Sequence, residues 1–299
     1  MENSPQDPKT SDALGRATFH HIPAQANVRP TVRELRWFKH IERHGPQSSV
    51  SLHELTRDTH RCKDTSLRQL QKLRAAGFLR LPPQQRATER AEFNPYIYDL
   101  TRKAEVHLAD LGIAEPTMRP TGHWWHGYNV ACATSTIDMA SARQGIRYIP
   151  AHEILAIKNT PLAIPVGQSK LIPDQLFALN YGGTYRAFAL EADRGTEPIT
   201  SAFARKSYSR SITQYAEAID RGLHKTHYGL RANLLALWVF NSHSNEQRFL
   251  ELLTRCSDVV QRTVLTKSVD LQALGHHPDT SLFAADWRRA AGGPCSIAA

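Results

Sequence analysis

The sequence predicts an α/β protein of two domains, the first mainly helical and the second built on a mixed sheet. Its 299 residues exceed the length of one average domain, and 41% of them are hydrophobic, which is typical of a globular protein with hydrophobic cores. Apolar residues recur at helical spacing in the first part of the chain, whereas apolar runs typical of strands occupy the second part.

The balance of charge favours an anionic partner. The net charge is +9 and the sequence pI is about 9.5, which points to nucleic acid first and to an acidic membrane surface second. The N-terminus lacks the apolar core of a secretory signal, and no apolar run is long enough to span a membrane. We therefore expect no membrane partner.

The cysteines argue against a disulfide framework and against a zinc site. Cys62, Cys132, Cys256 and Cys295 lie far apart and form no CxxC pair. A reducing, cytoplasmic location is the expectation that fits this spacing.

Residues 28–116 show the order of elements expected of a small DNA-binding domain. Residues 1–27 are polar, hold three prolines and predict a disordered tail. Helical spacing follows over 30–45, with Val32, Leu35, Phe38 and Ile41 apolar, then over a short segment at 51–59 and again over 62–77. Residues 77–81 and 96–101 predict a hairpin with a long tip, and a last helix runs from Thr101 to Gly112.

Three helices, two strands and a helix are the order of a winged helix-turn-helix, whose third helix enters the major groove. Between residues 61 and 80 there are six Lys or Arg residues and a single acid, Asp64, which leaves a surplus of +5. Double-stranded DNA is the expected partner, and a winged helix used for docking another protein is the alternative. The candidate DNA-binding residues are Arg61, Lys63, Ser66, Arg68, Gln69, Lys72 and Arg74.

A linker at 117–121 leads to a second domain at 122–285, and residues 286–299 predict a loose tail. The second domain has the pattern α-β-β-β-α-β. A helix ends at Gly145, a strand and a turn follow at 146–155, and two strands around Gly182 and Gly183 predict a hairpin. A long helix ends at Gly222, the apolar run at 231–240 predicts a central strand, and the final helix is expected to be capped by Ser244.

Three carboxylates stand at the ends of two adjacent predicted strands. Asp174 begins the first strand, while Glu191 and Asp193 close the second and share one face because they are two residues apart. Such a group can hold Mg²⁺ or Mn²⁺ for phosphodiester chemistry. The alternative is structural, with the acids capping strands or pairing with Arg194, Arg205 or Arg210.

These motifs resemble the PD-(D/E)XK nuclease superfamily, which has a restriction-endonuclease-like core. Pro173-Asp174 matches the first half of the motif and Glu191-Ala192 the next two positions. Asp193 stands where the superfamily places its lysine. The resemblance implies Asp174, Glu191 and Asp193 as catalytic and metal-binding residues, with Lys206 of the next helix as a displaced lysine.

A narrower resemblance covers most of residues 30–240. A winged helix followed by "PD", "LEADRGTEP" and "RKSYSRSITQY" is similar to the replication-relaxation family of plasmids and integrative elements. His126 falls in the helix where this family carries a polar residue facing the site. The resemblance implies partners among plasmid replication or mobilisation proteins, and a homodimer is one expected assembly.

Three functions stay open on the sequence. The first is a DNA-binding protein acting in replication, relaxation or mobilisation, with a nuclease-like domain that is active or degenerate. The second is a metal-dependent DNA endonuclease or nickase, and the third is a transcriptional or protein-docking regulator. Tyr208 and Tyr215 occupy one helix, but the HxH spacing that accompanies a relaxase tyrosine is absent.

Overall fold

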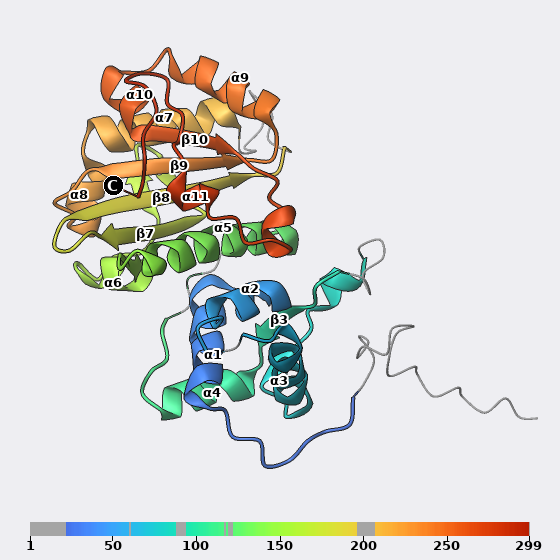
Figure 1. Cartoon of the computed structure of the whole chain (residues 1–299). Helices are drawn as coiled ribbons and strands as arrows, with labels where there is room; N and C mark the ends of the chain where they lie inside the picture. The colour runs from blue at the N-terminus through green and yellow to red at the C-terminus, as the bar shows by residue number, and fades with distance from the viewer. Residues whose placement is uncertain are drawn as a thin grey trace, which may run out of the picture. The chain divides into compact units, whose positions relative to one another are not determined.

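The computed structural model describes residues 22–59, 61–87, 94–116, 118, 122–195 and 207–298. In this part of the chain there are eleven α-helices, and the largest sheet is mixed and five-stranded. The protein is therefore α/β, as predicted. Two compact units meet in the sequence between Glu115 and Pro116, with Gly275–His277 grouped with the first unit (Figure 1).

The first unit follows the predicted order of elements with one addition. A strand of two residues, β1, lies between the first two helices and pairs with β3, so that the antiparallel sheet has the order β1-β3-β2. Two residues are too few for an alternating pattern to appear in the sequence. The elements are α1 (Val32–His44), β1 (Gln47–Ser48), α2 (Ser49–Leu55), α3 (Lys63–Ala75), β2 (Leu79–Arg80), a 3₁₀ helix (Pro83–Ala87), β3 (Ile97–Leu100) and α4 (Arg102–Asp110).

The core of the first unit lies between α1, α3 and the sheet. Trp37, Phe38 and Ile41 are buried on α1, and the Trp37 indole donates a hydrogen bond of 2.7 Å to the Leu52 carbonyl. Val32, the first apolar residue of the predicted helical spacing, is 82% exposed. The reason is its place in the first turn of α1, one turn before the residues that reach the core.

Gln85 closes the hairpin between β2 and β3 from inside the 3₁₀ helix. Its amide nitrogen donates to the Ile97 carbonyl at 2.8 Å, and its amide oxygen accepts from the Ile97 nitrogen at 2.8 Å. The side chain is 4% exposed. It therefore satisfies two backbone groups as a neighbouring strand would.

Gln85→Ala is expected to lower the free energy of unfolding of the first unit by about 1–2 kcal/mol, because both Ile97 groups lose their partner. Hydrogen exchange measures this locally, and the Ile97 amide should exchange faster. The exposed neighbour Gln84 provides the control, since Gln84→Ala leaves the pair intact. Equal exchange at Ile97 in both variants would contradict the role assigned to Gln85.

The second unit contains the five-stranded sheet, in the order β10-β9-β8-β7-β4. Strand β7 is antiparallel to both of its neighbours, β4 and β8, whereas β8, β9 and β10 run parallel to one another. Figure 1 shows α5 on one side of the sheet and α7, α9 and α10 on the other. Its strands are β4 (Arg147–Pro150), β7 (Gln175–Asn180), β8 (Tyr185–Asp193), β9 (Leu234–Phe240) and β10 (Val264–Ser268). A separate two-stranded sheet pairs β5 (Ile164–Val166) with β6 (Ser169–Leu171).

Most of the predicted elements of this unit are present. The hairpin between β7 and β8 turns at Gly182 and Gly183, whose φ values are 77° and 113°, and β9 lies between two strands, as its apolar run predicted. Ser242, not Ser244, is the N-cap of α9. The helices are α5 (Trp124–Arg143), α6 (Ala151–Ala156), α7 (Tyr208–Asp220), α8 (Leu223–Tyr228), α9 (His243–Leu253), α10 (Asp258–Thr263) and α11 (Ser281–Ala284).

The expectation of a loose tail at 286–299 is wrong for the described part of that segment. Trp287 and Ile297 are both fully buried, and Trp287 forms a β-bridge with Cys295. The Arg288 backbone exchanges hydrogen bonds with Thr266 of β10. Two large apolar side chains give this segment enough buried area to pack, although they are widely spaced in the sequence.

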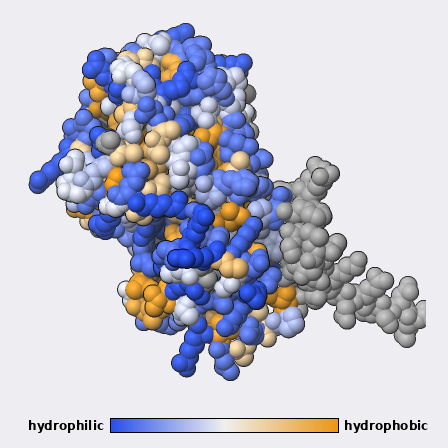
Figure 2. Space-filling model, viewed as in Figure 1, coloured by the Kyte–Doolittle hydropathy of each residue, from blue (hydrophilic) through white to orange (hydrophobic). Residues whose placement is uncertain are grey.

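Charged and polar residues cover most of the face shown in Figure 2, and apolar residues form small separate patches. None of the helices in the described ranges has the length and apolar character needed to cross a membrane.

Candidate functional site

The predicted meeting of Asp174 with the β8 carboxylates occurs in the structure. Gln175 pairs with Leu190, so Asp174, one residue before β7, lies opposite Glu191 in the same register. The Asp174 Oδ2 accepts a hydrogen bond of 2.9 Å from the Ala192 nitrogen. Asp174 is thus fixed to the end of β8 by the backbone.

Glu191 and Asp193 share the face of β8 that α7 covers. The Tyr215 hydroxyl donates to Glu191 Oε1 at 2.6 Å, and the Tyr208 hydroxyl donates to Asp193 Oδ2 at 2.5 Å. Asp193 Oδ1 accepts a further bond from the Gly195 nitrogen at 2.9 Å. Both carboxylates are 1% exposed, so they form a buried network with two tyrosines.

The two tyrosines are seven residues apart on α7, which places them on one face of the helix two turns from each other. Burial, and then the neighbouring Glu191 carboxylate, raise the pKa of Tyr215 well above its ordinary value. The phenol therefore stays protonated and donates to Glu191. A buried phenol held in this way is poorly placed to act as a nucleophile.

His126 joins the group from the first turn of α5. Its Nε2 lies 3.0 Å from Asp174 Oδ1. The sequence had indicated only that this residue faces the site. Beside it, an Arg194 guanidinium nitrogen lies 3.1 Å from His123 Nδ1. The end of the sheet thus carries acids that are matched by histidine, tyrosine and backbone donors.

The arrangement of Asp174, Glu191 and Asp193 does not fit a Mg²⁺ or Mn²⁺ site with three carboxylate ligands. Within the described ranges, no set of three ligand atoms that lie within 4.8 Å of one another includes Asp174, Glu191 or Asp193. Each of the three carboxylates accepts hydrogen bonds from protein donors. The arrangement matches hydrogen-bonded structural acids better than metal ligands. Lys206, the candidate displaced lysine, lies outside the described residues.

The second candidate surface is α3 in the first unit. Arg61, Lys63, Arg68 and Lys72 are exposed, and in the described ranges they form no ion pair. Gln69 and Arg74 are partly exposed. Arg68 and Lys72 are four residues apart and so lie on the same face of the helix.

Ser66 is the member of the predicted DNA-binding set that the structure removes from the surface. Its side chain is fully buried, and its hydroxyl lies 3.0 Å from His53 Nδ1. This contact joins α2 to α3. Ser66 therefore helps to hold α3 in place and is not available to a partner.

A comparison with family models decides the family. The model described as replication-relaxation matches residues 38–234. The chain belongs to the replication-relaxation family. The match includes α3 and the three carboxylates Asp174, Glu191 and Asp193, and it ends at the first residue of β9. No curated protein and no solved structure matches the chain.

The sequence alone had assigned no role in the site to the two tyrosines of this replication-relaxation protein. Their spacing on α7 was visible as a signal, but their partners were not. Tyr208 and Tyr215 pack edge-on against Trp238 of β9. This packing, which the sequence could not show, directs both hydroxyls toward β8.

Proposed function

We propose that this replication-relaxation protein binds double-stranded DNA through its first unit and acts in the replication or mobilisation of a plasmid or another mobile element. The family supports the biological setting. The observation that carries the DNA-binding part is the set of exposed basic residues on α3 and just before it, in which Arg68 and Lys72 share one face of the helix. The others are Arg61 and Lys63.

The order of elements supports a winged helix for this unit. A helix, a short strand, two helices and a hairpin surround one core, and the sheet order is β1-β3-β2. In a winged helix the third helix lies in the major groove, where Arg and Lys contact phosphates and base edges. The His53–Ser66 contact joins α2 to α3 and so helps to position α3.

The second unit is proposed to be a PD-(D/E)XK-like domain that keeps the fold without cleaving DNA. The antiparallel strands β4, β7 and β8 followed by the parallel β9, with α5 and α7 on the two faces, support the comparison. The motif position of the lysine is Asp193, whose carboxylate is already bonded to Tyr208 and Gly195. Metal-dependent nicking, the alternative, would require Glu191 and Asp193 to give up these donors.

A binding titration tests the proposal. The whole chain is titrated into a fluorescently labelled DNA duplex at several salt concentrations, and anisotropy is recorded. Because lysine and arginine release counterions from phosphates, we expect the logarithm of the binding constant to fall linearly with the logarithm of salt concentration, with a slope of several units. No binding, or binding that salt leaves unchanged, would favour a winged helix that docks another protein.

A further inference from the structure

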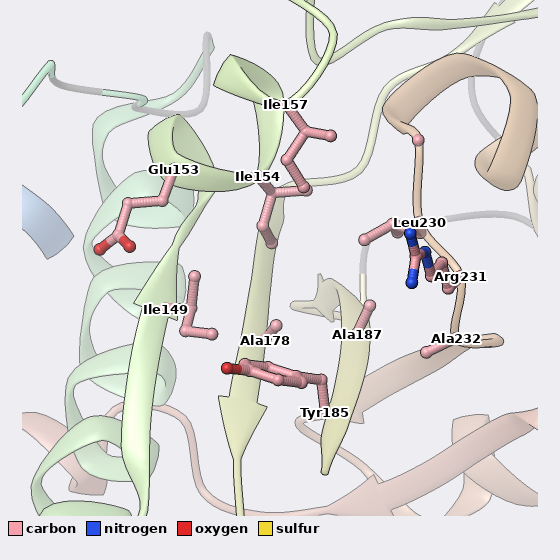
Figure 3. Close-up of a pocket in the computed structure, with 11 residues that line it drawn as sticks. Ile149, Glu153, Ile154, Ile157, Ala178, Tyr185, Ala187, Leu230, Arg231 and Ala232 are labelled. Atoms are coloured by element: carbon pink, nitrogen blue, oxygen red, sulfur yellow. The ribbon is translucent and has the colours of Figure 1, made fainter. Parts of the chain in front are cut away.

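A hollow of about 660 Å³ lies in the second unit, away from the acidic cluster of Asp174, Glu191 and Asp193. Figure 3 shows it between α6, the sheet and the segment that precedes β9. We call it the α6 hollow. It is lined by Ile149, Glu153, Ile154, Ile157, Ala178, Tyr185, Ala187, Gly229, Leu230, Arg231 and Ala232.

The floor of the hollow is open because two alanines meet across the sheet. Ala178 of β7 and Ala187 of β8 are direct cross-strand partners, and Figure 3 shows both at the bottom of the hollow. Side chains directly opposite each other on antiparallel strands normally contact and fill such a position. A methyl group at both places leaves space that a leucine at either would occupy.

The walls of the hollow are held by specific contacts. Gly229 has a φ of +77°, and a Cβ on it would lie only 3.0 Å from the Ile157 side chain. The Lys158 ammonium donates to the Thr226 carbonyl at 3.0 Å, and the Tyr228 hydroxyl donates to the Leu162 carbonyl. The segment that precedes β9 is therefore fixed against the end of α6, and the hollow is a built feature of the fold.

The charges at the rim favour an anion. Glu153 is paired with Arg147 at 2.6 Å, so its charge is already matched. Arg231 stands on the opposite side of the hollow in Figure 3 and forms no ion pair within the described ranges. Tyr185 adds a phenol, which accepts a hydrogen bond from Asn180. An apolar cavity with a single unmatched cation at its mouth has the character of a small-molecule site.

The α6 hollow is separate from the candidate site. It opens where β7 ends and β8 begins, near Tyr185, whereas Asp174 and Glu191 lie at the other end of the same two strands. Neither the acidic cluster nor the basic helix uses any residue that lines it.

We propose that the α6 hollow binds a small amphipathic carboxylate, an alkyl chain with one carboxylate group. The alkyl chain lies over Ala178 and Ala187 and between Ile154 and Leu230, and the carboxylate pairs with the Arg231 guanidinium. This site is independent of the proposed DNA-binding function, so the failure of one leaves the other standing.

Calorimetric titration of the whole chain with decanoate, and separately with decanol, tests this inference. We expect saturable binding of one decanoate per chain. Arg231→Ala should weaken decanoate about two- to fivefold, the range of an exposed ion pair, and leave decanol unchanged. Arg262→Ala removes another exposed arginine, from α10, and should leave both affinities as they are.

Two further variants test the position of the alkyl chain. Ala187→Leu fills the floor and should abolish binding of both ligands. Since Ala187 is buried, the melting temperature of the Ala187→Leu variant is measured as well. Ile157→Glu is tested in parallel, because Ile157 is 58% exposed and its replacement should not disturb the core. The introduced carboxylate should repel decanoate more than decanol.

Three results would overturn the inference. Decanoate binding that survives Arg231→Ala, Ile157→Glu and Ala187→Leu unchanged would place the ligand elsewhere. Equal affinities of the wild type for decanol and decanoate would mean that the Arg231 guanidinium does not pair with the ligand carboxylate. A dimer by light scattering that Ile157→Glu converts to a monomer, with no decanoate binding, would show that a second copy covers the hollow.

Discussion

Replacing Arg68 and Lys72 together by alanine is expected to weaken binding of the whole chain to duplex DNA roughly tenfold or more at physiological salt, and to lower the salt slope by about two units. Both side chains are exposed on α3, and they lie on one face of it. Each neutralised phosphate contributes about 0.9 to the slope, so two lost contacts account for the predicted change.

The control removes the same charge from another surface. Arg221→Ala with Arg262→Ala deletes two exposed arginines of the second unit, each paired with an acid four residues earlier in the chain. If α3 meets DNA, this variant keeps the wild-type slope. A slope that falls equally in both variants would mean that net charge, and not the α3 surface, drives binding.

Tyr215→Phe is expected to lower the free energy of unfolding of the second unit by about 2–3 kcal/mol. The change removes a donor to a buried carboxylate, which costs more than the loss of a bond between neutral groups. Glu191 is 1% exposed, so water cannot readily replace the phenol. Denaturant unfolding followed by tryptophan fluorescence measures the effect, since four of the five tryptophans belong to this unit.

Tyr185→Phe is the matched control for this measurement. Its ring is half exposed and its hydroxyl accepts from Asn180, which is partly exposed, so the loss should stay within about 0.5 kcal/mol. Unchanged stability of Tyr215→Phe would contradict a structural role for the network. A Tyr208→Phe/Tyr215→Phe variant that gains a Mn²⁺-dependent rise in melting temperature would instead show that the tyrosines mask a metal site.

Much of the fold followed from the local sequence pattern. The three first helices, the two hairpins and the central position of β9 each left a periodicity or a turn signal that the structure confirms. Strand β10 left none, because it follows α10 directly at Val264 with no turn residue between them. The hairpin of β5 and β6 was also missed, since each strand has three residues and Pro165 interrupts the first.

The candidate site was predictable only in part. The spacing of Glu191 and Asp193 and the register with Asp174 followed from strand geometry. Their partners did not, because Tyr208, Tyr215 and His126 are brought to them by the packing of two helices on opposite faces of the sheet. Whether an acid binds a metal or a phenol is decided by such tertiary neighbours, which a linear motif does not specify.

Incubation of the whole chain with supercoiled plasmid, with and without Mn²⁺ and beside Asp174→Asn, tests most directly whether this is a DNA-binding protein on a nuclease-like fold. We predict that the plasmid is retarded on a native gel in both conditions and stays supercoiled after the protein is removed. Nicked plasmid that appears only with Mn²⁺, and that Asp174→Asn fails to produce, would contradict this account and make the carboxylates a catalytic site.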